Sequence, residues 1–370
     1  MRIKHLWGLR VRCLARTPNM LSLRPFFLLL LLVTLPLAAR ADHEAAVARQ
    51  LGFRLVRLAH RGETVSFLVA GDSSALQQRK PVLLFCQGSE TSPLITVDEK
   101  GPFFIGWSFD FKAYQSRYHV VVIGKPGVPV VAPVAALDPA SYSYLDPATR
   151  AMPAFLQACD TREYYADTAE AVLRYLRRQS WTDPRQTVVM GGSQGYHVAA
   201  RLARLDRHVT HAVLFSSNPY SRLHQYVSDA RAEQYRGHLT PEQAQGRIDT
   251  LYTQYRALMA GTQAAAEPAF GAHWRNWVSF TKHAAVDELL QLRIPVLVAY
   301  GTADVGSALN DLLPFEFMRC GKTNLTLRPY PGLTHQFLQP LPDKNGQPQR
   351  PEYKGNDVLR DVMQWLPTLL

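Results

Sequence analysis

The chain has 370 residues, of which 47% are hydrophobic and 19% are charged, and its formal net charge is +11. This composition is too apolar for a disordered chain, and neither a collagen-like glycine period nor a solenoid-length repeat is present. The length predicts two domains or one large α/β domain with insertions.

The positive charge is concentrated at the amino terminus. Residues 1–41 contain seven basic residues and no acidic residue, so the other 329 residues contain 34 basic and 30 acidic side chains. A protein that reads phosphates usually keeps a basic stripe on its folded domain. Because the excess lies in the first segment, we predict no nucleic-acid partner.

Residues 1–41 have the pattern of a secretory signal peptide. A basic segment precedes the apolar run Phe26–Ala39, and the Ala-Arg-Ala sequence at 39–41 matches a cleavage site. We expect cleavage after Ala41, export to the periplasm or the extracellular space, and no stable membrane span afterwards. An uncleaved anchor and a true start at Met20 remain alternatives.

The processed chain would retain Cys86, Cys159 and Cys320, which have no metal or redox spacing. Cys86 lies inside an apolar run and is interpreted as a buried thiol. If one disulfide forms in an oxidising compartment, we expect it to join Cys159 and Cys320.

Apolar runs and helical periodicity predict the elements in chain order. A helical or mobile lead-in at 42–52 is followed by a hairpin, by buried strands and by helices. The hairpin is expected at 53–56 and 64–69, the strands at 81–86, 119–123, 187–190, 209–215, 295–300 and 325–328, and the helices at 161–178, 194–205 and 355–366. This alternation predicts an α/β fold with a mostly parallel sheet that helices cover on both faces.

Two segments interrupt the alternation. Residues 124–160 form a long irregular excursion, and residues 219–292 are rich in Tyr and Trp and contain amphipathic helical stretches. We expect the second segment to be a helical lid over the strand ends. The predicted organisation is a hydrolase-type core at 42–218 and 293–370 with the lid inserted at 219–292.

The sequence Gly191-Gly192-Ser193-Gln194-Gly195 follows one apolar strand and precedes a helix of small residues. A G-x-S-x-G motif with these flanks is typical of a nucleophile elbow. The sharp turn requires small residues beside the serine and lifts its hydroxyl from the sheet. The amino terminus of the helix below favours developing negative charge.

On these residues, the chain from about 53 to 370 resembles the α/β-hydrolase family. The resemblance implies a nucleophile, an acid and a histidine in that chain order, here Ser193, Asp304 and His335. A serine hydroxyl needs a base to take its proton, and a third group must orient that base. His197 as the base and Asp311 as the acid are the weaker alternatives.

An oxyanion hole requires two N–H groups that face the developing negative oxygen. The resemblance assigns one to Gln194 and the other to the loop after strand 81–86. That loop begins Gln87-Gly88-Ser89-Glu90, which departs from the His-Gly typical of the family. We expect Ser89 to donate its N–H while Gly88 permits the turn. Glu90 could repel acidic substrates, bind a basic group, or simply be solvated.

The sequence therefore predicts a serine hydrolase that cleaves a carboxylic ester or a related acyl bond through an acyl-enzyme. The expected partner is a small-molecule or peptide-like acyl substrate, and neither a metal nor a cofactor is expected. A peptidase or amidase, an acyltransferase and a non-catalytic binding protein on the same scaffold remain alternatives. The oligomeric state is not predicted.

Overall fold

A computed structural model describes residues 42–71, 74, 77–341 and 349–368. The predicted leader, with its cleavage site and Met20, lies outside these residues. Ala45–Leu370 forms one unit, which is described here by itself. Among the described residues, no helix is long and apolar enough to cross a membrane.

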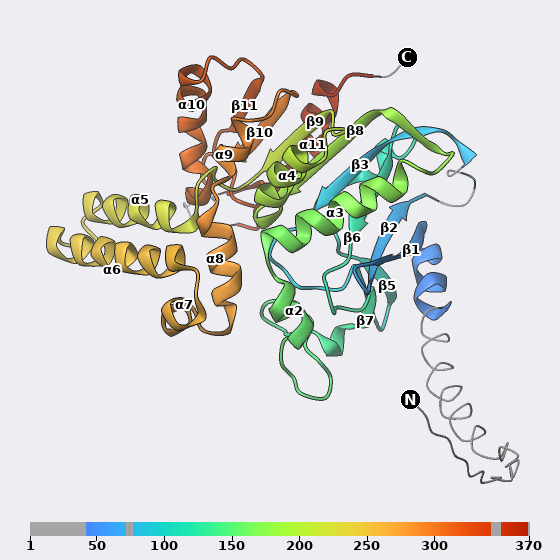
Figure 1. The fold of residues 1–370 in the computed structure, drawn as a ribbon, viewed down its shortest axis with the longest axis horizontal. Helices are drawn as coiled ribbons and strands as arrows, with labels where there is room; N and C mark the ends of the chain where they lie inside the picture. Colours follow the sequence, from blue (N-terminus) through green and yellow to red (C-terminus); the bar gives the residue numbers. More distant parts are fainter. Residues whose placement is uncertain (1–41, 72–73, 75–76, 342–348, 369–370) are drawn as a thin grey trace, which may run out of the picture. The chain divides into compact units, whose positions relative to one another are not determined.

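An eight-stranded mixed sheet forms the centre of the unit, in the order β1-β2-β6-β3-β8-β9-β10-β11 (Figure 1). β1 (Phe53–His60) and β2 (Glu63–Ala70) form the predicted hairpin, and β2 also pairs antiparallel with β6. The six strands from β6 onward in this order are parallel, which confirms the predicted α/β class. They are β3 (Lys80–Cys86), β6 (His119–Ile123), β8 (Thr182–Gly192), β9 (His211–Phe215), β10 (Val296–Gly301) and β11 (Leu325–Tyr330).

The three predicted core helices are present as α3 (Arg162–Leu176), α4 (Gln194–Leu205) and α11 (Gly355–Trp365). The α3 helix begins where the Thr161 side chain accepts a hydrogen bond from the Tyr164 N–H. Threonine is favoured just before a helix because its side-chain oxygen accepts a hydrogen bond from an N–H that has no partner within the helix. Residues 42–50 are also helical.

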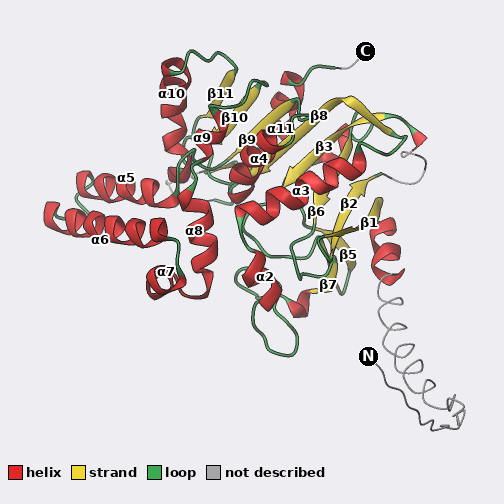
Figure 2. Cartoon of the chain, in the orientation of Figure 1, coloured by secondary structure: helices red, strands yellow, loops and turns green. Residues whose placement is uncertain are grey.

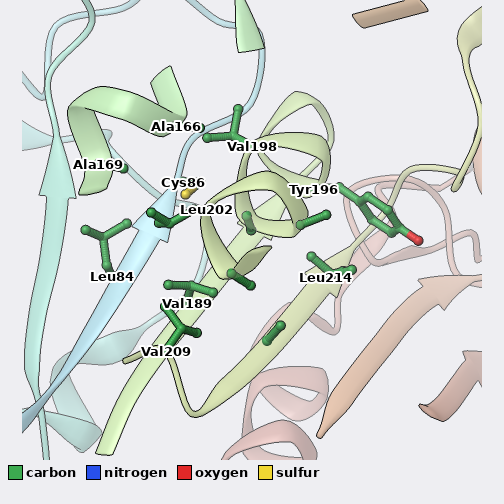
Figure 3. Close-up of a cluster of buried hydrophobic side chains, with 14 of the residues drawn as sticks. Leu84, Cys86, Ala166, Ala169, Val189, Tyr196, Val198, Leu202, Val209 and Leu214 are labelled. Atoms are coloured by element: carbon green, nitrogen blue, oxygen red, sulfur yellow. The ribbon is translucent and has the colours of Figure 1, made fainter. Parts of the chain in front are cut away.

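The parallel strands are buried on both faces, so alternate side chains enter two apolar clusters. Leu84 and Cys86 pack with α3 and α4, as Figure 3 shows. Leu83 and Phe85 point to the opposite face, where they pack in the cluster that contains α11. Each fully buried side chain of this size contributes about 1.5–3 kcal/mol to folding. The continuous apolar runs in the sequence reflect this double burial.

Small elements occupy the irregular excursion at 124–160 and other segments for which the sequence predicts no strand of the main sheet. A three-stranded sheet, in the order β5-β4-β7, and a two-stranded sheet lie outside the main sheet. These elements are β4 (Ile95–Asp98), β5 (Gly101–Phe104), β7 (Val131–Pro133), α2 (Ala154–Cys159), β12 (Leu338–Gln339) and β13 (Glu352–Tyr353). Most are too short to produce a recognisable hydrophobic period. Short 3₁₀ helices complete these connections, η2 (Phe111–Tyr114), η3 (Val134–Ala136), η4 (Gly271–His273) and η5 (Val305–Leu312), and α10 (Leu313–Arg319) follows η5.

Helices α5 to α9 fill the chain between β9 and β10 and include the predicted helical insertion (Figure 2). They are α5 (Arg222–Tyr235), α6 (Pro241–Ala260), α7 (Gln263–Phe270), α8 (Trp274–Lys282) and α9 (Ala285–Leu289). A small apolar cluster of their own joins Leu223, Leu258 and Ala266 with Trp277. The boundaries at 218/219 and 292/293 stay predictions.

The expected Cys159–Cys320 disulfide is wrong. Cys86, Cys159 and Cys320 are all free thiols. Cys159 lines a cavity with His60 and Glu63 beside the β1–β2 edge of the sheet. Cys320 follows α10, which packs against β11 at the opposite edge. The strand order therefore keeps these two thiols apart.

Candidate active site

Ser193 occupies the sharp turn between β8 and α4, at the centre of the parallel sheet. Its φ of 54° and ψ of −120° are strained for a residue with a side chain. The Ser193 N–H donates to the Phe215 carbonyl oxygen at 3.0 Å, which fixes the turn against β9. The hydroxyl makes no capping hydrogen bond to α4. These features are those expected of a nucleophile elbow.

The two glycines of the motif have steric reasons. A Cβ atom on Gly195 would overlap the carbonyl oxygen of Cys86, and one on Gly191 would overlap the carbonyl oxygen of Gly195. The turn therefore packs directly against the end of β3. This close approach holds the serine beside the loop that follows β3.

Asp304 and His335 form a hydrogen-bonded pair. The Nδ1 atom of His335 lies 2.8 Å from the Asp304 Oδ2 atom. Asp304 is buried and also accepts hydrogen bonds from the Gly306 N–H at 3.0 Å and from the Ser307 hydroxyl at 2.5 Å. Three donors thus fix the carboxylate, which in turn orients the half-exposed imidazole of His335.

The protonation equilibria of this pair shift in opposite directions. Burial raises the pKa of Asp304, but hydrogen bonds from His335, Ser307 and the Gly306 N–H outweigh burial and hold it below its ordinary value. The hydrogen bond to Asp304 raises the pKa of His335 against the effect of burial. The nearby charges of Glu90 and Arg222 act on the His335 pKa in opposite senses, Glu90 raising it and Arg222 lowering it.

The loop that carries His335 is held against β10. A Cβ atom on Gly301 would overlap the carbonyl oxygen of Leu333, and the Ala303 N–H donates to that same oxygen at 3.0 Å. The glycine at the end of β10 therefore permits the histidine loop to approach the aspartate loop. Gly301 is therefore required for a steric reason, because a side chain there would overlap the histidine loop.

Ser193 and His335 line the same two cavities. Within the described part of the chain, no hydrogen bond joins the Ser193 hydroxyl to the imidazole. Hydrogen bonds between a nucleophile and its base are often long before substrate binds. Ser193 and His335 thus line shared cavities and His335 contacts Asp304, whereas the assignment of the three residues as a catalytic triad stays a prediction.

Of the predicted oxyanion residues, Gly88 and Gln194 line the cavities that Ser193 and His335 share, and Ser89 follows Gly88 in the same loop. A Cβ atom built on Gly88 would lie 3.7 Å from the Ser193 Cβ and would collide with the Glu90 carboxylate. Gln194 is the first residue of α4, where the N–H groups have no partners within the helix. The Ser89 N–H has no acceptor among the described residues.

Sequence reasoning missed Lys125. Its Nζ atom donates to the Gly88 carbonyl oxygen at 2.6 Å and to the Gln194 Oε1 atom at 3.3 Å. The side chain is buried, and its ammonium lies 4.5 Å from the centre of the Tyr165 ring. Burial lowers the pKa of Lys125 to about 8, although Asp160 and Glu90 favour the charged form. A lysine within Gly124-Lys125-Pro126-Gly127, directly after a buried parallel strand, was the available signal.

The two alternative residues have other partners. The His197 Nε2 atom lies 3.2 Å from the Ser217 hydroxyl, and burial lowers the His197 pKa to about 3. Asp311 accepts a hydrogen bond from the Tyr300 hydroxyl. His335 is therefore the histidine that pairs with a buried carboxylate beside Ser193, and Asp304 is that carboxylate.

One of the two cavities is largely aromatic and has a volume of about 320 Å³. We call it the aromatic cavity, and its apolar walls are Phe85, Trp107, Phe109, Phe215 and Phe337. Glu90 also lines it, so a carboxylate lies at its edge. A cavity of this size and lining accommodates an apolar group of a small molecule.

The other cavity is smaller, about 90 Å³, and is polar. We call it the polar cavity, and besides Ser193 and His335 its lining includes His197, Asn218, Arg222, Gln225, Asn276 and Trp277. Arg222 and Gln225 belong to α5, and Asn276 and Trp277 belong to α8. The inserted helices thus form one wall of the site.

The residues described here include no group of three or more His, Cys, Asp or Glu side chains that could hold a metal ion.

Comparison with known proteins gives fold-level similarity alone. No family model matches the sequence, and no curated protein matches it. A Bacteroides ovatus protein assigned as a dipeptidyl aminopeptidase IV is similar in structure, with a TM-score of 0.51 at 12% identity over 85% of this chain and 35% of its own. The Pyrococcus horikoshii acylaminoacyl peptidase has a TM-score of 0.46 at 11% identity, over 76% of this chain and 37% of its own. A Bacillus subtilis protein assigned as a hydrolase has a TM-score of 0.46 at 12% identity, over 88% and 98% of the two chains.

The chain spans about a third of the length of the two peptidases, 35% and 37%. The similarity to the Bacteroides protein agrees with three features of this chain, which are the sheet order, the serine turn after β8 and the histidine loop after β11. Together, these observations show that the chain has the α/β-hydrolase fold.

Proposed function

We propose that this protein is a serine hydrolase that cleaves a carboxylic ester or a related acyl bond. One observation carries the proposal. Ser193, in a strained turn, shares two cavities with a histidine that a buried aspartate holds at 2.8 Å. A nucleophile, a base and an orienting carboxylate in this arrangement support acyl transfer.

The tautomer of His335 follows from its contact with Asp304. Because the ionised carboxylate accepts a hydrogen bond, Nδ1 carries the proton, and Nε2 of the neutral ring keeps its lone pair. Nε2 would take the proton of Ser193 as the hydroxyl oxygen attacks the substrate carbonyl. The imidazolium would then protonate the leaving group, and water activated by the same nitrogen would release the acid.

The contact between Lys125 and Gly88 supports an oxyanion hole at Ser89 and Gln194. The Gly88 carbonyl and the Ser89 N–H belong to one trans peptide unit, so they point in opposite directions. Lys125 binds that carbonyl and lines a separate cavity with Gln87 and Tyr165. The Ser89 N–H therefore points away from Lys125, and we assign it with the Gln194 N–H to the negative oxygen of the intermediate.

A fluorophosphonate probe tests the proposal, because it labels only an activated serine. We expect the wild-type protein to be labelled and both Ser193→Ala and His335→Ala to lose labelling while remaining folded. Ser228→Ala and His238→Ala are matched controls, since Ser228 and His238 lie on or next to α5 outside both cavities. Folded wild-type protein that resists labelling would contradict a catalytic function and favour a binding protein.

A second comparison separates an esterase from a peptidase or amidase. Each ester is assayed beside the amide that has the same acyl group. Because esters are intrinsically more reactive than amides, the proposal expects Ser193-dependent cleavage of the ester and no measurable cleavage of the matched amide. Ser193-dependent cleavage of aminoacyl amides would assign the same residues to a peptidase.

A further inference from the structure

Arg222 introduces a charge into the polar cavity that the hydrolytic machinery does not use. It is the first residue of α5, and it lines the cavity together with Ser193 and His335. No aspartate or glutamate is among the described residues that line this cavity. Histidine apart, Arg222 is the one ionisable side chain among these lining residues.

The guanidinium of Arg222 is held by a ring rather than by an acid. Its central carbon lies 5.4 Å from the centre of the Trp277 ring, and no ion pair to Arg222 is present in the described part of the chain. Contact with an aromatic ring leaves N–H donors of the planar guanidinium available. These donors match the two oxygens of a carboxylate.

The lining of the polar cavity adds neutral donors, and the carboxylate beside it, Asp304, is already held by His335 and Ser307. The Asn276 carboxamide lines the same cavity and has no hydrogen-bond partner among the described residues. Glu90, the acidic residue near Ser193, lines the aromatic cavity and not the polar one. Arg222 also lowers the pKa of His335, so its charge is felt at the proposed base.

We propose that Arg222 binds a carboxylate of the substrate, so that the preferred substrate is an acyl compound with a carboxylate a few bonds from the scissile carbonyl. This inference rests on the proposed hydrolase function and specifies its substrate class. The aromatic cavity would receive the apolar part of the same molecule. The carboxylate end of the substrate would therefore lie in the polar cavity and its apolar end in the aromatic cavity.

Two matched substrate pairs test the inference. One pair places the carboxylate on the acyl side, as the mono-para-nitrophenyl ester of glutaric acid against para-nitrophenyl pentanoate. The other places it on the alcohol side, as meta-carboxyphenyl butanoate against phenyl butanoate. In one pair, we expect the charged ester to have a kcat/KM about 10- to 100-fold above the neutral ester, the gain from a charge-assisted hydrogen-bonded pair.

Arg222→Gln should remove this preference, measured as the ratio of kcat/KM for the charged ester to kcat/KM for its neutral partner in the same protein. Because Arg222 also lowers the pKa of His335, both esters are assayed at the same pH, and an effect on the base would change both rates and leave their ratio unaffected. Arg275→Gln is the matched control, because Arg275 contacts Trp274 on α8 and does not line the polar cavity. It should keep the preference. Equal rates within both pairs, or a preference that survives in Arg222→Gln, would overturn the inference.

A binding measurement separates this inference from the hydrolase proposal. In the Ser193→Ala protein, calorimetry with each intact ester should show tighter binding of the charged ester, and adding Arg222→Gln should abolish the difference. This result would hold even if turnover were absent. If the Ser193→Ala protein bound the charged and neutral esters equally while the wild-type protein kept Ser193-dependent hydrolysis, the carboxylate subsite would be rejected and the hydrolase proposal would stand.

Discussion

The Lys125 ammonium nitrogen lies 2.6 Å from the carbonyl oxygen of Gly88 and contacts the Gln194 side chain at 3.3 Å. A buried charge is retained only where its partners compensate for lost hydration. Here the partners are the two residues next to which the negative oxygen of an intermediate would form. We therefore expect the lysine to hold the Gly88–Ser89 peptide unit and the Gln194 side chain beside the nucleophile without touching the reacting atoms.

Lys125→Met should lower kcat by about 10- to 100-fold with little change in KM, because loss of the contact loosens one N–H donor that acts on the transition state. A boronic acid that mimics the tetrahedral intermediate should lose affinity in parallel. The Tyr165 ring would still cover the methionine. A purely structural lysine would instead change KM and kcat together and leave the ratio of boronate to substrate affinity unchanged.

The same lysine should produce an alkaline limb in the rate profile. Because the Lys125 pKa is lowered to about 8, the ammonium loses its proton as pH rises through that value, and the hydrogen bond to Gly88 weakens. Wild-type kcat should therefore fall above pH 8. Lys125→Met should have lower kcat throughout and no such limb, as stopped assays from neutral pH to pH 10 would determine. A wild-type alkaline limb retained by Lys125→Met would assign it to another group.

Asp304→Asn should reduce kcat/KM by about a thousandfold or more, since an asparagine neither fixes the required tautomer of His335 nor stabilises the imidazolium. The pH profile adds a signed test. Asp304 raises the pKa of His335, and the base works in its neutral form, so wild-type activity falls as pH drops through that pKa. The residual activity of Asp304→Asn should persist to lower pH.

Asp311→Asn serves as the control for this substitution. Asp311 bonds to the Tyr300 hydroxyl and not to His335 in the structure. We expect near wild-type activity and an unchanged acid limb. A thousandfold loss in this variant would transfer the role of the acid to Asp311.

Gly195→Ala should destabilise the protein by at least about 2 kcal/mol, because the added methyl group would overlap backbone atoms at the end of β3. Gly246→Ala is the opposite case. It lies within α6, where a Cβ meets nothing within 4 Å, and it should stabilise by about 0.5–1 kcal/mol. Urea unfolding of both variants measures the difference, and equal stabilities would contradict the packing of the serine turn.

A thiol titration checks the cysteine assignment in a chain that starts at Asp42. Cys320 is exposed and should react rapidly with an aromatic disulfide reagent in the native protein. Cys86 should resist, because burial raises its pKa to about 12. Unfolding should release three thiols without a reductant, whereas a disulfide would leave only one.

The sequence predicted those parts of the fold that depend on local patterns. Doubly buried strands such as 81–86 produce continuous apolar runs, and the small residues around Ser193 report the tight turn directly. Strand order is a different matter, since it depends on pairing between distant segments. The cysteine pairing was wrong for that reason, because Cys159 and Cys320 could be separated only once β1 and β11 were known to be opposite edges.

The same distinction applies to the site. Ser193, Asp304 and His335 follow strand ends, and the resemblance to the α/β-hydrolase family implies them in this chain order. Lys125 has no motif, and its importance depends on the loop after β3 lying across from the loop after β6. The polar cavity was also unpredictable, because it forms only where α5 and α8, which pack against η5 and α3, approach the loops that carry Ser193 and His335.

The helices between β9 and β10 supply one group of site residues, and the loops of the sheet supply another. The groups proposed to break and make bonds come from loops of the sheet, whereas Arg222, Asn276 and Trp277 come from the intervening helices. Substitutions in the helices between β9 and β10 could therefore change which substrate is bound without changing the residues proposed for catalysis. Proteins that descend from one ancestor could therefore catalyse the same reaction and differ in substrate specificity.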